Sequence, residues 1–158
     1  MPIAQSRIST VSITEPRIHA LVESILRQQN TAVLGTCFME IPRCSQVPFA
    51  VSEDLRTIVI ITAQNTAKYE NMAANPNVSL LVAAPAAEEA TLQALTVTAF
   101  AAKPKGARKS QAMALFIRKH PETFCGNDDI SVILSIFEDK VLPLSRSINV
   151  RVYWYNSK

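Results

Sequence analysis

Glycine is scarce in this sequence, at three of 158 residues. Neither GxGxxG nor GxxxxGK[ST] occurs, which excludes the glycine-rich phosphate loops of Rossmann and P-loop proteins. The three cysteines, Cys37, Cys44 and Cys125, are odd in number and lack CxxC spacing, and there are only two histidines, His19 and His120. Because this pattern supports neither a disulfide framework nor a zinc site, we expect no metal and interpret the thiols as buried small hydrophobes.

Long apolar runs and a strong excess of one charge are also missing. No stretch approaches the roughly 18 consecutive apolar residues of a membrane-spanning helix, and residues 1–14 contain no apolar signal region. We therefore expect a cytoplasmic protein with no membrane partner. The net charge of +3 is too small to indicate a dedicated nucleic-acid binder. Motifs such as GxSxG and HExxH are absent too, so no catalytic residue is assigned.

Apolar periodicity predicts three helices within one domain over residues 15–158, which follows a flexible N-terminal arm over 1–14. The first helix begins at Pro16 behind Thr14 as N-cap and ends near residues 28–30. Its apolar stripe consists of Ile18, Leu21, Val22, Ile25 and Leu26. A short helix over Ala67–Ala74 is capped by Asn65 or Thr66. The last spans Lys109–His120, with Met113, Phe116, Ile117 and His120 on its apolar stripe.

Six or seven strands are expected from runs of β-branched and alternating residues: 31–38, 44–51, 57–62, 77–83, 92–101, 130–137 and 148–155, with a further short one near Val141 left open. Pro48 implies an edge, a bulge or a gap in the ladder. The short connections between the first three strands predict an antiparallel meander. Because strict βαβ alternation is absent, the pattern favours a mainly β (α+β) fold, an antiparallel barrel with flanking helices.

The segment from Thr62 to Lys68 is the most informative for chemistry. A buried strand ends in a polar turn with two threonine hydroxyls, and a helix with a lysine in its first turn follows at once. The hydroxyls of Thr62 and Thr66, the free N–H groups of the helix and the Lys68 ammonium together suit a phosphate group. Alternatively, Thr66 is only an N-cap and Lys68 a solvated charge.

The order of elements, with Thr62-xxx-Thr66-x-Lys68-xx-Asn71-xxx-Asn75-Pro76-x-Val78 before a strand, resembles the pyridoxamine-5′-phosphate-oxidase-like family of flavin-binding split barrels. The likeness runs from Ile18 to Ala101. It implies a six- to seven-stranded split β-barrel that binds FMN at a homodimer interface.

The resemblance also implies roles for individual residues. Thr66 and Lys68 would hold the FMN phosphate, with Thr62 close by. The strand segment Gln46, Val47, Pro48 and Phe49 would run past the isoalloxazine ring and contact its polar edge mainly through backbone groups. Gln93, contributed by the other subunit, would reach the same ring.

The sequence departs from vitamin-B6-oxidising members of that family. Gln46 and Ala67 stand where those members have arginines, and Ser145–Ser147 with Arg151 only faintly match their C-terminal signature, so we do not expect pyridoxamine oxidation. A glycine usual in the first hairpin turn is missing as well, and Met39–Arg43 in its place predicts a longer or differently shaped turn.

The leading hypothesis is an FMN-dependent oxidoreductase that acts on a small-molecule redox substrate. The alternatives are a non-catalytic homodimer that binds flavin or haem, and a deazaflavin-dependent reductase. The basic residues that flank the last helix, among them Arg118 and Lys119, are interpreted as a solvated face. His120, before Pro121, is interpreted as a capping or packing residue rather than a haem or metal ligand.

Overall fold

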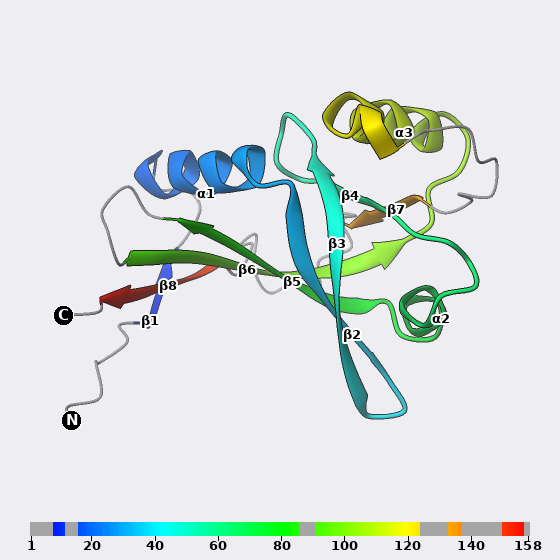
Figure 1. The fold of residues 1–158 in the computed structure, drawn as a ribbon, viewed down its shortest axis with the longest axis horizontal. Helices are drawn as coiled ribbons and strands as arrows, with labels where there is room; N and C mark the ends of the chain where they lie inside the picture. Colours follow the sequence, from blue (N-terminus) through cyan, green and yellow to red (C-terminus); the bar gives the residue numbers. More distant parts are fainter. Residues whose placement is uncertain (1–7, 12–15, 86–90, 124–132, 137–149, 157–158) are drawn as a thin grey trace.

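The computed structural model describes residues 8–11, 16–85, 91–123, 133–136 and 150–156. These residues form eight strands, three α-helices and one 3₁₀ turn (Figure 1). In chain order they are β1 (Ile8–Val11), α1 (Pro16–Gln28), β2 (Thr31–Phe38), β3 (Ile41–Val51), β4 (Ile58–Ile61), α2 (Ala67–Ala74), β5 (Asn77–Pro85), β6 (Thr91–Ala102), α3 (Ala107–Lys119), η1 (Pro121–Thr123), β7 (Ile133–Ile136) and β8 (Val150–Asn156).

All strand pairings are antiparallel, in the order β1-β8-β6-β5-β2-β3-β4-β7. An additional pairing between β6 and β7 joins the far end of this order back to its middle and closes a ring of six strands. The length of β6 makes this closure possible, because its first half pairs with β8 while Ala101 and Ala102 pair with β7. The predicted antiparallel α+β split barrel is confirmed.

Several predicted elements have the observed bounds. The helix over Pro16–Gln28, the strand over Thr31–Phe38 and the helix over Ala67–Ala74 are confirmed, as is the meander of the first three predicted strands, β2, β3 and β4. Pro48 lies where β3 changes partners, since pairing with β2 ends at Pro48 and pairing with β4 begins at the next residue. The proline is therefore the last residue of one ladder, at the switch to the next, a position where its missing N–H group is tolerated.

The first hairpin turn corrects the sequence interpretation. β3 begins at Ile41 rather than Cys44, and Phe38 pairs with Ile41, so the loop contains only Met39 and Glu40. Both have positive φ, at 50° and 63°. This is the backbone that a two-residue hairpin loop requires, and the chain adopts it here without glycine. The turn is therefore tight, not longer, and the hairpin extends beyond the barrel (Figure 1).

One core fills the barrel and continues beneath α1. Its fully buried members are Leu34, Val47, Phe49, Ile58, Ile60, Leu80, Val82 and Leu95. Val22, Ile25 and Leu26 of the predicted helical stripe belong to the same core. A smaller cluster joins Phe116 of α3 to Ala50 and Val59. In Figure 1, α1 and α3 lie along one side of the barrel and α2 lies on another.

Gly35 lies at a close approach between strands. It is paired with Ser79 of β5, and a Cβ atom at this position would lie 2.6 Å from the Ser79 hydroxyl. A side chain there would force the serine to rotate.

Three further sequence interpretations need correction. The expected arm contains a strand, because Ile8–Val11 pairs with β8, which raises the strand number among the described residues to eight. Cys37 is half-buried and Cys44 is exposed, so these two thiols are not the buried small hydrophobes that the sequence suggested. Ile117 is also exposed, so it does not belong to the buried stripe of α3. Cys125, the strand near Val141 and the side chains of β8 lie outside the residues whose surroundings are described.

Candidate functional site

The junction between β4 and α2 carries the predicted phosphate-binding residues. Thr66 is the N-cap of α2, and its hydroxyl oxygen accepts a hydrogen bond from the Tyr69 N–H at 3.4 Å. It also donates to the Ala63 carbonyl at 2.8 Å and lies 3.0 Å from the hydroxyl of buried Thr62. A hydroxyl has one proton, so Thr62 is the donor in that last contact. The N-cap interpretation of Thr66 is confirmed.

The remaining anion-binding capacity lies in the backbone and in Lys68. With one proton donated and two lone pairs occupied, Thr66 has no spare hydrogen-bonding position in this arrangement. The N–H groups of Ala67 and Lys68 open the helix and have no acceptor within it. The helix dipole adds positive charge at this end, and Lys68, a half-buried residue, carries a positive side chain in the first turn.

Two buried contacts fix the orientation of α2 on the barrel. The Asn71 amide donates to the hydroxyl of Thr36 in β2 at 3.0 Å, and both side chains are buried. Met72 packs into the main core beside them. Sequence reasoning quoted Asn71 as part of a motif but did not identify its partner, 35 positions earlier, because only the fold brings the two together.

The strand segment Gln46–Phe49 presents mainly backbone to any ligand outside the barrel. Val47 and Phe49 are fully buried in the core, so their side chains are not available on the surface. Gln46 is exposed and donates to the Thr31 hydroxyl at 3.3 Å, while Pro48 is half-buried. This burial agrees with a contact made by backbone groups and excludes the Val47 and Phe49 side chains in their present rotamers.

Strand register brings these two groups of residues to neighbouring positions. Phe49 pairs with Ile60 in the antiparallel ladder of β3 and β4, and Thr62 follows Ile60 by two residues. The end of β4, the start of α2 and the outer segment of β3 therefore adjoin. Gln93 lies on β6 opposite Ala84 and Trp154, and its side chain is outside the described set.

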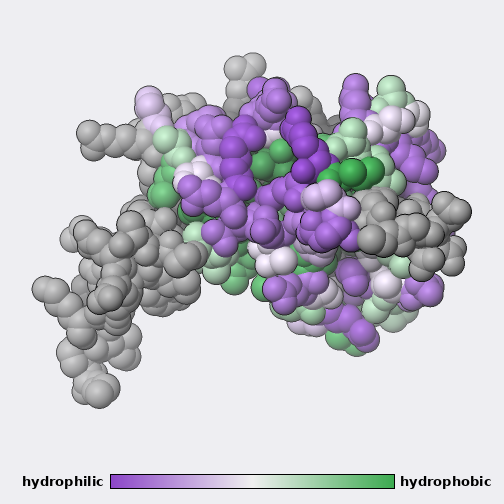
Figure 2. All heavy atoms as spheres, turned by 45° about the horizontal axis from the view of Figure 1, so that its top comes forward, coloured by the Kyte–Doolittle hydropathy of each residue, from purple (hydrophilic) through white to green (hydrophobic). Residues whose placement is uncertain are grey.

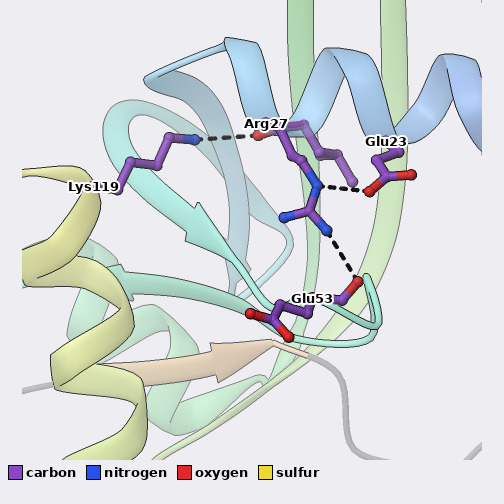
Figure 3. Close-up of polar contacts among 5 residues, drawn as sticks. Glu23, Arg27, Glu53 and Lys119 are labelled. Atoms are coloured by element: carbon purple, nitrogen blue, oxygen red, sulfur yellow. Dashed lines mark hydrogen bonds and ion pairs between the residues drawn. The ribbon is translucent and has the colours of Figure 1, made fainter.

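A second polar group, missed by sequence reasoning, lies where α1, α3 and β3 meet (Figure 3). The Lys119 ammonium donates to the carbonyls of Gln29 at 2.6 Å and Leu26 at 3.2 Å. Arg27 forms an ion pair with Glu23 at 2.7 Å and donates to the Glu53 carbonyl at 3.1 Å. Lys119 thus ties α3 to the last carbonyls of α1, where the helix dipole favours a cation.

Lys119 is half-buried, which corrects its interpretation as part of a solvated face. Burial, with the nearby Arg27 guanidinium as a second cause, lowers the pKa of Lys119 to about 8. A cleft of about 200 Å³ opens here, lined by Arg27, Ala50, Val51, Leu115, Arg118 and Lys119. Hydrophilic residues gather over this side of the molecule (Figure 2). The cations stand at the carboxyl ends of two helices, so capping explains them without a ligand.

His120 confirms the capping and packing interpretation. Its backbone N–H donates to the Phe116 carbonyl at the end of α3, and its ring lies 4.7 Å from the Phe116 ring. Buried Nε2 is 2.8 Å from the Phe49 carbonyl, which can only accept, so Nε2 carries the proton. The histidine therefore fixes the β3 backbone at Phe49, the last residue of the segment Gln46–Phe49.

Neither a metal-ligand cluster nor a membrane-spanning helix occurs in the part of the chain that the structure describes. Within that part, no three His, Cys, Asp or Glu side chains gather as metal ligands would. Nor does any helix there have the length and apolar character needed to cross a membrane.

Solved structures with the same fold include flavin- and haem-binding proteins. A FAD-binding protein from Mesorhizobium loti is 15% identical with a TM-score of 0.67, and the match covers 96% of this chain and 99% of that one. HutZ, a haem storage protein from Vibrio cholerae, is 15% identical with a TM-score of 0.62, over 77% and 90%. A haem-binding protein from Mycobacterium smegmatis is 20% identical with a TM-score of 0.61, over 72% of this chain. The chain spans 49% of that protein's length.

These identities establish the fold alone. No curated protein matches the sequence. The family model described as pyridoxamine 5′-phosphate oxidase, however, matches residues 18–129, which include the ring strands β2–β6 and the β4–α2 junction. This chain therefore belongs to the pyridoxamine 5′-phosphate oxidase family.

Proposed function

We propose that this protein binds a flavin nucleotide by its FMN moiety, with the phosphate at the amino-terminal end of α2. The observation that carries the proposal is the make-up of this end: the backbone N–H groups of Ala67 and Lys68 have no acceptor in the helix, and Lys68 brings a positive side chain to the same turn. A phosphate monoester carries about two negative charges at neutral pH, and a helix N-terminus with an adjacent cation complements them.

Each part of the chain has a defined task in this proposal. Thr66 holds the turn from β4 into α2 through its three hydrogen bonds, one of which it accepts from the Thr62 hydroxyl. The outward backbone groups of Gln46–Phe49 adjoin the flavin ring, and His120 holds the opposite side of that segment. Gln93 of a second copy would complete the slot, so the functional unit is a homodimer.

When bound, the flavin supplies electron transfer at its ring, and the chain supplies binding, orientation and exclusion of water. We propose that the protein is an oxidoreductase with a small-molecule substrate. Ala67 and Gln46 offer no guanidinium donors, in contrast to vitamin-B6-oxidising members, which argues against pyridoxamine oxidation. A cytoplasmic location stays a prediction from the sequence.

Haem binding is the second candidate, because two of the similar structures are of haem-binding proteins. The histidines of this chain give it less support. The Nε2–H of His120 is committed to the Phe49 carbonyl inside the protein, and His19 is exposed on α1. A deazaflavin-dependent reductase remains the third candidate, for which the β4–α2 junction supplies few cations.

The test is a fluorescence titration of the full chain with FMN, together with its visible absorption spectrum after purification. We expect Lys68→Ala to weaken FMN binding by about 10- to 150-fold, since a hydrogen bond to a charged group contributes roughly 1.5–3 kcal/mol. Lys109→Ala, which removes an equal charge from the exposed surface of α3, is the matched control. Equal FMN affinity in wild type and Lys68→Ala would reject the phosphate position, and a Soret band in the spectrum would favour haem.

A further inference from the structure

A second cleft, of about 220 Å³, lies beside α2 at the edge of the main core, to which Met72 and Ala101 belong. It is lined by Tyr69, Met72, Ala73, Pro76, Ala101 and Lys103. The first four recur at intervals of three and four residues, so they form one face of α2 and its continuation. Ala101 and Lys103 belong to the end of β6 and the residues after it. The FMN site proposed above does not use this cleft.

The lining suits a flat, weakly polar ring next to a negative group. Tyr69 offers a half-buried aromatic ring, and Met72 contributes a buried, polarizable thioether to the floor. The exposed Lys103 places its ammonium 5.9 Å from the centre of the Tyr69 ring. Sites for whole drug-sized ligands measure roughly 300–1,000 Å³, so a cleft of this size holds one ring system rather than an entire cofactor.

The position of the cleft relates it to the phosphate site. The helix rises 1.5 Å per residue, so Ala73 lies about 9 Å along the axis from Ala67, where α2 begins. A second phosphate and a ribose span a distance of that order. Each place has a lysine: Lys68 is the second residue of α2, and Lys103 lines the cleft.

We infer that this cleft receives the adenine of a flavin adenine dinucleotide whose FMN half occupies the site at the start of α2. The inference rests on the proposed function and extends it from the FMN moiety to the dinucleotide. The adenine stacks on Tyr69, and the Lys103 side chain moves from the ring face to the pyrophosphate. Base–aromatic stacking and an added ion pair both favour the dinucleotide over FMN.

The test compares FAD and FMN binding by fluorescence titration in wild type and two tryptophan variants. Ala73→Trp fills the cleft from an exposed helix position, and Ala74→Trp places the same side chain on a neighbouring exposed position outside the cleft. We expect wild type to bind FAD at least tenfold more tightly than FMN. Ala73→Trp should remove this preference without changing FMN affinity, and Ala74→Trp should keep it.

A second variant tests the charge. Lys103→Gln should reduce FAD affinity severalfold and leave FMN affinity unchanged, because FMN does not reach this side chain. If FMN and FAD bind equally well and Ala73→Trp affects neither, the adenine site is wrong while the FMN site stands. If Ala73→Trp weakens FMN as much as FAD, the cleft is not an adenine site. Failure of wild type to bind either flavin would refute the proposed function itself.

Discussion

Replacement of Thr66 by alanine is the sharpest test of how the β4–α2 junction is held. The substitution removes the cap on the Tyr69 N–H, which costs about 1 kcal/mol. It also removes the acceptor of the Thr62 hydroxyl, which is 5% exposed and makes its side-chain hydrogen bond with Thr66 among the described residues. A buried hydroxyl left without a partner costs roughly 1–3 kcal/mol. The free energy of unfolding should therefore fall by about 2–4 kcal/mol in total.

The assay is urea unfolding followed by circular dichroism, with Thr66→Ser as the control that keeps the hydroxyl. The double variant Thr62→Val/Thr66→Ala removes the stranded hydroxyl, so it should be more stable than Thr66→Ala alone by about 1 kcal/mol. A loss below about 0.5 kcal/mol for Thr66→Ala, or strictly additive effects in the double variant, would refute this reasoning. Thr66 would then be an ordinary surface residue.

Three further predictions concern the hairpin, α3 and the buried histidine. Glu40→Gly should raise the free energy of unfolding by about 1 kcal/mol, because φ is 63° there and a side chain opposes that backbone; a lower melting temperature would contradict the turn geometry. The pKa of Lys119 is about 8 when folded, against 10.5 for an ordinary lysine. Between these values the unfolded chain holds a proton that the folded chain has lost, so stability should rise with pH across this window, and urea unfolding of Lys119→Met should lack that rise. His120→Phe should cost roughly 1–3 kcal/mol by leaving the Phe49 carbonyl without its donor, and a change below 0.5 kcal/mol in urea unfolding would argue against that hydrogen bond.

Local patterns in the sequence were sufficient to predict the helices α1 and α2. The stripe of Val22, Ile25 and Leu26 defined α1, because a helix with one apolar face must bury it. Thr66 at the end of a buried strand, with Asn75 before Pro76, fixed both ends of α2. The expectation of a longer hairpin turn, drawn from the absence of glycine, was wrong. The pairing of β2 with β3 leaves a two-residue loop, in which Met39 and Glu40 adopt positive φ.

The candidate site was only partly predictable, because its parts come from strands and helices far apart in the chain. The sequence identified Thr66 and Lys68 as a local unit, but it did not show that Val47 and Phe49 face the core.

The sequence by itself determined the bounds of α1, β2 and α2, the apolar face of α1, and the motif shared with the family, because these depend on neighbours within about seven residues. Tertiary structure decided the closure of β6 on β7, the Asn71–Thr36 and Lys119–Gln29 hydrogen bonds, and the cleft between Tyr69 and Lys103. Each of these features joins residues that are distant in the sequence. The local periodicity of a segment does not specify which distant strand or helix it will contact in the folded chain.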